Sequence, residues 1–139
     1  IKKGIEQDEY NPEFYYVFGD VQAKLGFLEE ALIAYEKVKE LDPENQEIWY
    51  DTAWMYDQLD NKTSALLCFQ EGIELQEKND RLLYSFVAFL LKYGRKEDAL
   101  FNLDKALALN FDGYEYLFEV QPEAKYNLSV LELIDYYRS

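Results

Sequence analysis

The feature of this sequence that most constrains its fold is a period of 34 residues that runs through most of the chain. Five columns of identical residues recur at that interval. They are Asn11, Asn45 and Asn79; Tyr16, Tyr50 and Tyr84; Ala31, Ala65 and Ala99; Leu32, Leu66 and Leu100; and Leu41, Leu75 and Leu109. A fixed period of this length is typical of arrays in which each repeat is one supersecondary unit that buries its apolar face against its neighbours.

Each repeat has the pattern of two consecutive helices. An asparagine side chain can accept a hydrogen bond from an unpaired amide at a helix start, so the recurring asparagines predict N-caps. The first helix then ends near Gly26, Asp60 or Gly94, and glycine at such a point permits the left-handed conformation that stops a helix. A second apolar stripe with spacings of three and four, such as residues 28–41, predicts a second helix that is buried along one side.

Composition narrows the classes of partner. The chain of 139 residues is 49% apolar and carries 28 acidic against 14 basic side chains, a formal charge of -14. No apolar run approaches the roughly 18 residues that a membrane-spanning helix requires. The negative charge would repel phosphate backbones and anionic lipid, so we expect neither nucleic acid nor a membrane as partner. It favours basic polypeptides, or it simply keeps the protein soluble.

The sequence offers little for catalysis or metal binding. It has no histidine and a single cysteine, Cys68, on a predicted packing helix. Histidine is the side chain most used for proton transfer near neutral pH, and the usual zinc sites need histidine or several cysteines. We therefore expect no enzymatic activity, no metal and no cofactor, with Cys68 as a small apolar side chain. A lone cysteine suits a reducing compartment, which favours the cytoplasm but does not decide the localisation.

The aligned columns resemble the tetratricopeptide repeat family, whose 34-residue unit carries the pattern W-x2-L-G-x2-Y, then A-x3-F and a late proline. The first copy supplies Tyr15, Phe18, Gly19, Ala31, Tyr35 and Pro43, and the second supplies Trp49, Tyr56, Ala65 and Phe69. The third copy keeps the apolar character with looser matches.

The resemblance implies an all-α fold, a right-handed α-solenoid of antiparallel helix hairpins. Three repeats (12–45, 46–79 and 80–113) would fill residues 11–113. Residues 1–10 would be the end of a preceding repeat helix, because Gly4-Ile5-Glu6 recurs as Gly72-Ile73-Glu74. Residues 114–139 would form a partial repeat, interrupted by Pro122, and a C-terminal capping helix.

The resemblance also implies a function, which is to bind a partner polypeptide, basic or uncharged, in a concave groove lined by the first helix of each repeat. The inward positions would be Glu13, Tyr16, Asp20, Glu47, Tyr50, Asp51, Trp54, Asp57, Arg81 and Tyr84. Aromatic side chains give rigid contact surface and the carboxylates would attract basic groups. Two alternatives stay open. The tyrosines could be ordinary packing between repeats, and the whole segment could be a spacer or self-association part of a longer solenoid, as a homo-oligomer.

Overall fold

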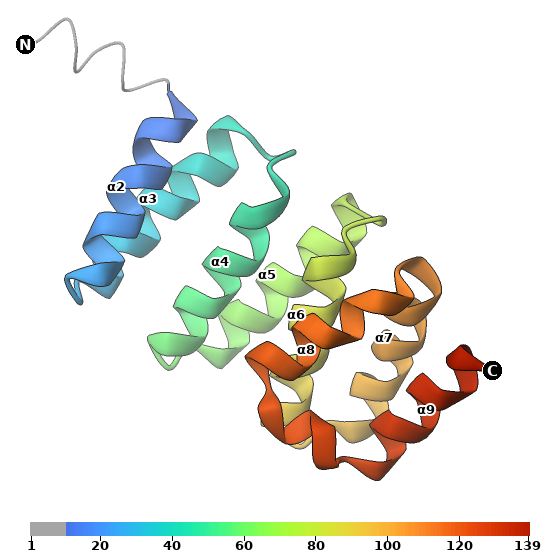
Figure 1. The fold of residues 1–139 in the computed structure, drawn as a ribbon. Coiled ribbons are helices and arrows are strands. Elements are labelled where there is room, and N and C mark those ends of the chain that lie inside the picture. The colour runs from blue at the N-terminus through green and yellow to red at the C-terminus, as the bar shows by residue number, and fades with distance from the viewer. Residues whose placement is uncertain (1–10) are drawn as a thin grey trace, which may run out of the picture. The chain divides into compact units, whose positions relative to one another are not determined.

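Eight α-helices and two short 3-10 helices make up residues 11–139, the part of the chain that the computed structural model describes, and this part contains no strand. The helices are α2 (Pro12–Lys24), α3 (Leu28–Leu41), α4 (Gln46–Gln58), α5 (Lys62–Leu75), α6 (Asp80–Lys92), α7 (Lys96–Leu109), η1 (Phe111–Gly113), α8 (Tyr114–Val120), η2 (Pro122–Tyr126) and α9 (Leu128–Arg138) (Figure 1). The expectation of an all-α chain is confirmed. The helix end expected at residues 1–10 lies outside the described residues.

The recurring asparagines cap the first helix of each hairpin, as the period predicts. The side-chain oxygens of Asn45 and Asn79 each accept a hydrogen bond of 3.1 Å from the amide three residues later. The oxygen of Asn11 accepts from the amide of Glu13 at 3.0 Å. Each such cap stabilises its helix by about 1 kcal/mol relative to alanine.

Left-handed residues end the same three helices. Gly26 and Gly94 have φ angles of 87° and 73°, and Asp60 has a φ of 62° at the equivalent position of the second hairpin. Glycine adopts this conformation without steric cost, and aspartate is one of the few other residues that tolerates it. The backbone therefore turns at the same place in each hairpin although the residue differs.

The chain divides into two compact units, with the boundary between Gly72 and Ile73 in the last turn of α5. In the first unit α2 pairs with α3, and α3 also packs against α4. Fully buried residues of the first unit include Ala31, Val38, Ile48, Ala53, Ala65 and Phe69. Alternation of alanine with large side chains lets the helix backbones approach closely while the aromatic rings fill the space beside them.

The second unit, Ile73–Ser139, is built around the hairpin of α6 and α7. The short α8 packs against α6, and α9 packs against α7 through the buried side chains of Val130 and Ile134. Pro122 follows α8 and begins η2, since its ring cannot continue a helix. None of the helices in residues 11–139 is long and apolar enough to cross a membrane.

Candidate functional site

The equivalent sides of α2 and α4 present acidic and aromatic side chains together. Their predicted site residues lie 34 residues apart or at neighbouring positions, so on each of the two helices they share one side. Carboxylates at Glu13, Asp20 and Glu47 are exposed, and the side chains at Tyr16, Tyr50, Asp51 and Trp54 are half-buried. We call these seven residues the acidic face.

Two tyrosine–aspartate hydrogen bonds tie three helices together at this face. The hydroxyl of Tyr16 on α2 donates to the carboxylate of Asp51 on α4. The hydroxyl of Tyr35 on α3 donates to Oδ1 of Asp20 on α2 at 2.5 Å. The rings of Tyr16 and Tyr35 pack edge to face with centroids 5.7 Å apart. The sequence identifies Tyr35 only as the aromatic residue of the repeat pattern, because its partner lies on another helix and no local spacing reveals the bond.

Burial changes the titration of these groups. Partial burial raises the pKa of the Asp51 carboxyl to about 6, and the negative charges of Asp20 and Glu47 act in the same direction. The hydrogen bond from Tyr16 opposes this rise. Burial, followed by the hydrogen bonds to the aspartates, raises the pKa of the hydroxyls of Tyr16 and Tyr35. Both tyrosines are therefore hydrogen-bond donors throughout the physiological range.

Replacing Asp51 with asparagine is expected to stabilise the protein at neutral pH and to leave it unchanged in acid. The folded pKa of Asp51 lies above the ordinary value of 3.8. The native state therefore binds this proton more tightly than the unfolded state. The tighter binding of this proton therefore contributes to the free energy of unfolding. That contribution is fully present below about pH 4 and is lost as the pH rises through about 6.

Asparagine can still accept the hydrogen bond from Tyr16 and carries no charge to desolvate. The expected gain for Asp51→Asn at pH 7 is about 1–2 kcal/mol, because residual water around the carboxyl screens part of the shift. Urea unfolding of both proteins from about pH 4 to about pH 7.5 measures the difference between their free energies of unfolding. If the difference between the two free energies of unfolding did not change with pH, the raised pKa of Asp51 would be contradicted.

Two of the predicted site residues, Tyr84 and Asp57, are buried, and Arg81 contacts an aromatic ring. Tyr84 on α6 is 0% exposed, and its hydroxyl donates to the carbonyl oxygen of Asn110 at 2.6 Å. Asp57 on α4 is 7% exposed. Arg81 is exposed, but its guanidinium lies 4.1 Å from the centroid of the Tyr116 ring within the second unit. The prediction that Tyr84 and Asp57 offer contact surface is therefore corrected, since both side chains are buried.

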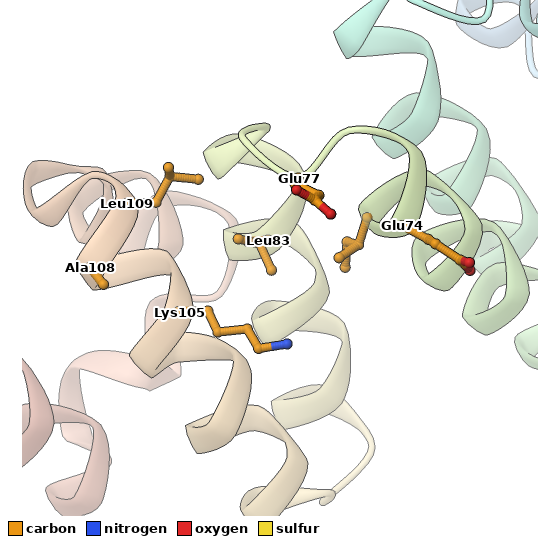
Figure 2. Close-up of a pocket in the computed structure, with 7 residues that line it drawn as sticks. Glu74, Glu77, Leu83, Lys105, Ala108 and Leu109 are labelled. Carbon is orange, nitrogen blue, oxygen red and sulfur yellow. The ribbon is translucent and has the colours of Figure 1, made fainter.

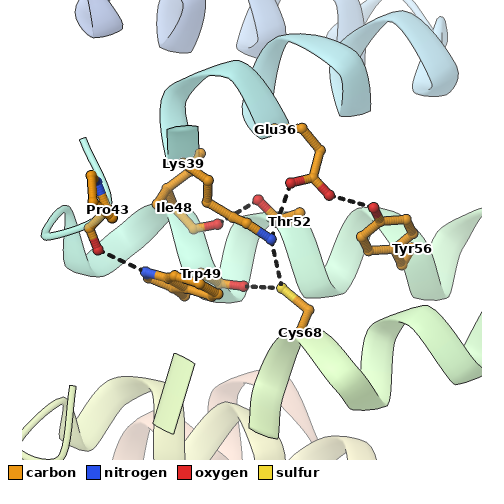
Figure 3. A network of polar contacts seen from close by, with 8 residues as sticks. All are labelled: Glu36, Lys39, Pro43, Ile48, Trp49, Thr52, Tyr56 and Cys68. Carbon is orange, nitrogen blue, oxygen red and sulfur yellow. Dashed lines mark hydrogen bonds and ion pairs between the residues drawn. The ribbon is translucent and has the colours of Figure 1, made fainter. Parts of the chain in front are cut away.

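A polar network in the first unit links α3, α4 and α5 (Figure 3). Nζ of Lys39 lies 3.0 Å from a carboxylate oxygen of Glu36 and 4.6 Å from the centre of the Trp49 ring. The hydroxyl of Tyr56 donates to the other oxygen of Glu36. Nε1 of Trp49 donates to the carbonyl oxygen of Pro43 at 3.0 Å. Every one of these groups has a partner within the fold, so the network is structural.

Cys68 lies buried beside this network. Its thiol is 3.4 Å from the carbonyl oxygen of Trp49 and 3.7 Å from Nζ of Lys39. Burial raises the pKa of the thiol to about 11, although the charge of Lys39 acts in the opposite direction. The thiolate is the reactive form of cysteine, so this side chain is an unreactive apolar group near neutral pH. Lys39 is a basic neighbour that the local sequence did not reveal.

A cavity of about 610 Å³ lies in the second unit, between the end of α5 and the α6–α7 hairpin. Figure 2 shows apolar side chains on its walls, among them Leu83 and Leu109, with Lys105 reaching toward it from α7. Glu74 and Glu77 lie on the opposite side. No group of three or more cysteine or carboxylate side chains among residues 11–139 could hold a metal ion.

Comparison with known proteins finds the same 34-residue repeat. The family model of the tetratricopeptide repeat matches residues 12–45 and 46–79. Of the chains of known structure, 32 match. No curated protein sequence matches.

Two of the similar structures illustrate the likeness. YrrB is described as a TPR protein with an unusual peptide-binding site; it superposes with a TM-score of 0.64, covers 98% of this chain and 72% of its own, and is 23% identical. MamA superposes with a TM-score of 0.69, covers 98% of this chain and 79% of its own, and is 19% identical. At these identities the likeness shows the fold, which is a series of adjacent helix pairs.

Proposed function

Because this chain carries tetratricopeptide repeats, which are protein–protein interaction modules, we propose that it holds a segment of a partner polypeptide against the acidic face. The observation that carries the proposal is the hydrogen bond from Tyr16 to Asp51, which joins α2 to α4 and so fixes one continuous face across two repeats. A preorganised face loses little conformational entropy when a ligand binds.

The chemistry of the face favours a basic or uncharged segment. Glu13, Asp20 and Glu47 are exposed carboxylates, and around them lie half-buried aromatic side chains. Carboxylates steer lysine and arginine toward the surface, and tyrosine and tryptophan supply rigid contact area with hydrogen-bonding groups. YrrB, which shares the fold, is described as binding peptide. We infer that neither nucleic acid nor a bilayer is the partner, because the net charge of -14 repels both.

A lysine-rich synthetic peptide is expected to bind this face and to change the tryptophan fluorescence through Trp54. Replacing Glu13 and Glu47 together with glutamine should weaken binding about three- to tenfold, since each exposed ion pair contributes modestly. Tyr50→Ala should weaken binding further through loss of contact area. Fluorescence titration at low and high salt measures both effects.

The matched control replaces Glu29 and Glu71 with glutamine. Both are exposed glutamates of the first unit outside the acidic face, and the change in net charge is the same. If this control weakened binding as much as Glu13→Gln with Glu47→Gln, the attraction would be general and the face would not be the site. Absence of any binding, together with concentration-dependent dimers in sedimentation, would favour the alternative of a self-association or spacer segment.

A further inference from the structure

A second surface of the first unit, on another side of α2, is apolar and open. Phe14, Phe18, Val21 and Leu25 are between 41% and 63% exposed. Their spacings of four, three and four residues place them on one side of the helix, separate from Tyr16 and Asp20 on the acidic face. The rings of Phe14 and Phe18 stack with centroids 6.2 Å apart, so these two side chains form one apolar surface.

The same stripe one repeat later is covered by a helix. Residues 34 positions on from Phe14, Phe18 and Val21 are Ile48, Thr52 and Met55, which are 0%, 0% and 9% exposed. There α3 packs against α4. The fold therefore shows what kind of element this side of a first helix accepts, namely a helix with a stripe of apolar side chains.

The open face is hollowed and has an acidic rim. A cavity of about 500 Å³ lies between α2 and α3, and Phe14, Tyr15, Phe18 and Ile33 supply its apolar walls. Glu30, Glu36, Glu40 and Lys37 surround it. Lys37 is 3.9 Å from Glu40, and Glu36 is paired with Lys39. With Lys39 included, the rim has three carboxylates against two ammonium groups, a small excess of negative charge.

We propose that this α2–α3 face is a second docking surface, distinct from the acidic face, and that it receives an amphipathic helix of a partner protein. The helix carries an apolar stripe at spacings of three and four, with lysine or arginine beside the stripe. Apolar side chains enter the hollow between α2 and α3, and the basic groups lie against Glu30 and Glu40. The chain would then engage one partner at two places, or two partners at once.

The test uses a fluorescein-labelled synthetic helix with leucine at four stripe positions and lysine on both flanks. The full chain is titrated into this peptide, and the fluorescence anisotropy of the peptide reports binding. We expect binding to weaken as salt is raised, because salt screens the contacts with the charged rim. A peptide with glutamate in place of every lysine should bind at least about tenfold more weakly. Equal binding of the two peptides would overturn the proposed partner chemistry.

Two phenylalanines provide matched variants. Phe18→Ser removes a central side chain of the stripe and should weaken binding at least about tenfold. Phe27→Ser changes the same residue type at a similarly exposed position at the start of α3, outside the cavity wall, and should leave binding unchanged. Circular dichroism checks that both variants remain helical. If Phe18→Ser left the affinity for the lysine peptide unchanged, this face would be excluded as the docking surface.

Two further outcomes would assign the face to another occupant and overturn the proposal. One is concentration-dependent dimerisation of the chain that Phe18→Ser abolishes, which would make a second copy the occupant. The other is binding of the lysine peptide only after residues 1–10 are removed, which would make the chain's own first residues the occupant. Sedimentation velocity and the same anisotropy titration distinguish these outcomes.

Discussion

Replacing Tyr84 with alanine is expected to lower the free energy of unfolding of the second unit by about 3–5 kcal/mol, the range for removal of a large buried aromatic side chain. Tyr84 is fully buried, and its hydroxyl bonds to the carbonyl oxygen of Asn110. Its ring lies so close to Gly113 that a Cβ there would come within 2.3 Å of it. The ring therefore fastens the segment after α7 onto α6, and its loss would leave a cavity at that contact.

Tyr84→Phe separates the ring from the hydroxyl. It should cost only about 1 kcal/mol, the net value of one hydrogen bond. Tyr50→Ala removes the equivalent residue of the second repeat, which is half-buried, and should cost clearly less than Tyr84→Ala. Urea unfolding followed by circular dichroism measures all three. Equal costs at Tyr84 and Tyr50 would show that burial does not distinguish the two positions.

Replacing Gly19 with valine is expected to destabilise the first unit by about 3 kcal/mol through overpacking. A Cβ at Gly19 would lie 2.6 Å from Cε1 and 2.8 Å from Cδ1 of Tyr35, and 3.3 Å from the carbonyl oxygen of Ala31. Tyr35 is buried and its hydroxyl is bonded to Asp20, so the ring cannot move aside freely. The change would push α2 away from α3.

The cause can be isolated with a double mutant. If the ring of Tyr35 is the obstacle, Gly19→Ala should cost less in a chain that already carries Tyr35→Leu than in the natural chain. The comparison uses alanine because it adds only the Cβ whose contacts the structure defines. Thermal and urea unfolding give the four free energies of the cycle, and strictly additive effects would mean that another contact limits the space at Gly19.

The sequence predicted the helices well because their signals are local. An asparagine cap, a left-handed residue at the helix end and a proline that stops a helix each act within a few residues. The period of 34 then predicted that adjacent helices pair. The division of the chain within α5 was not predicted, since the compact units depend on how many contacts cross each point of the chain. The handedness of the solenoid stays a prediction.

The functional residues were predicted less well, because the same column of the repeat has different surroundings in each copy. Tyr16, Tyr50 and Tyr84 occupy the same position of the 34-residue repeat. Tyr16 nevertheless donates a hydrogen bond to Asp51, whereas Tyr84 lies inside the second unit. Neither difference can be read from spacing. That the seven residues of the acidic face form a binding surface stays a prediction, which the peptide titration tests.

The sequence by itself determined the repeating helical hairpin, its caps and its acidic charge, because these follow from short-range backbone preferences and from composition. Tertiary structure alone decided which tyrosine is a core residue, which carboxyl has a raised pKa and which side of α2 is open. Burial and electrostatic environment are sums over neighbours that are distant in sequence. Asp51 shows the distinction. Its carboxyl group is evident in the sequence, but its pKa of about 6 arises only when the fold buries it near the negative charges of Asp20 and Glu47.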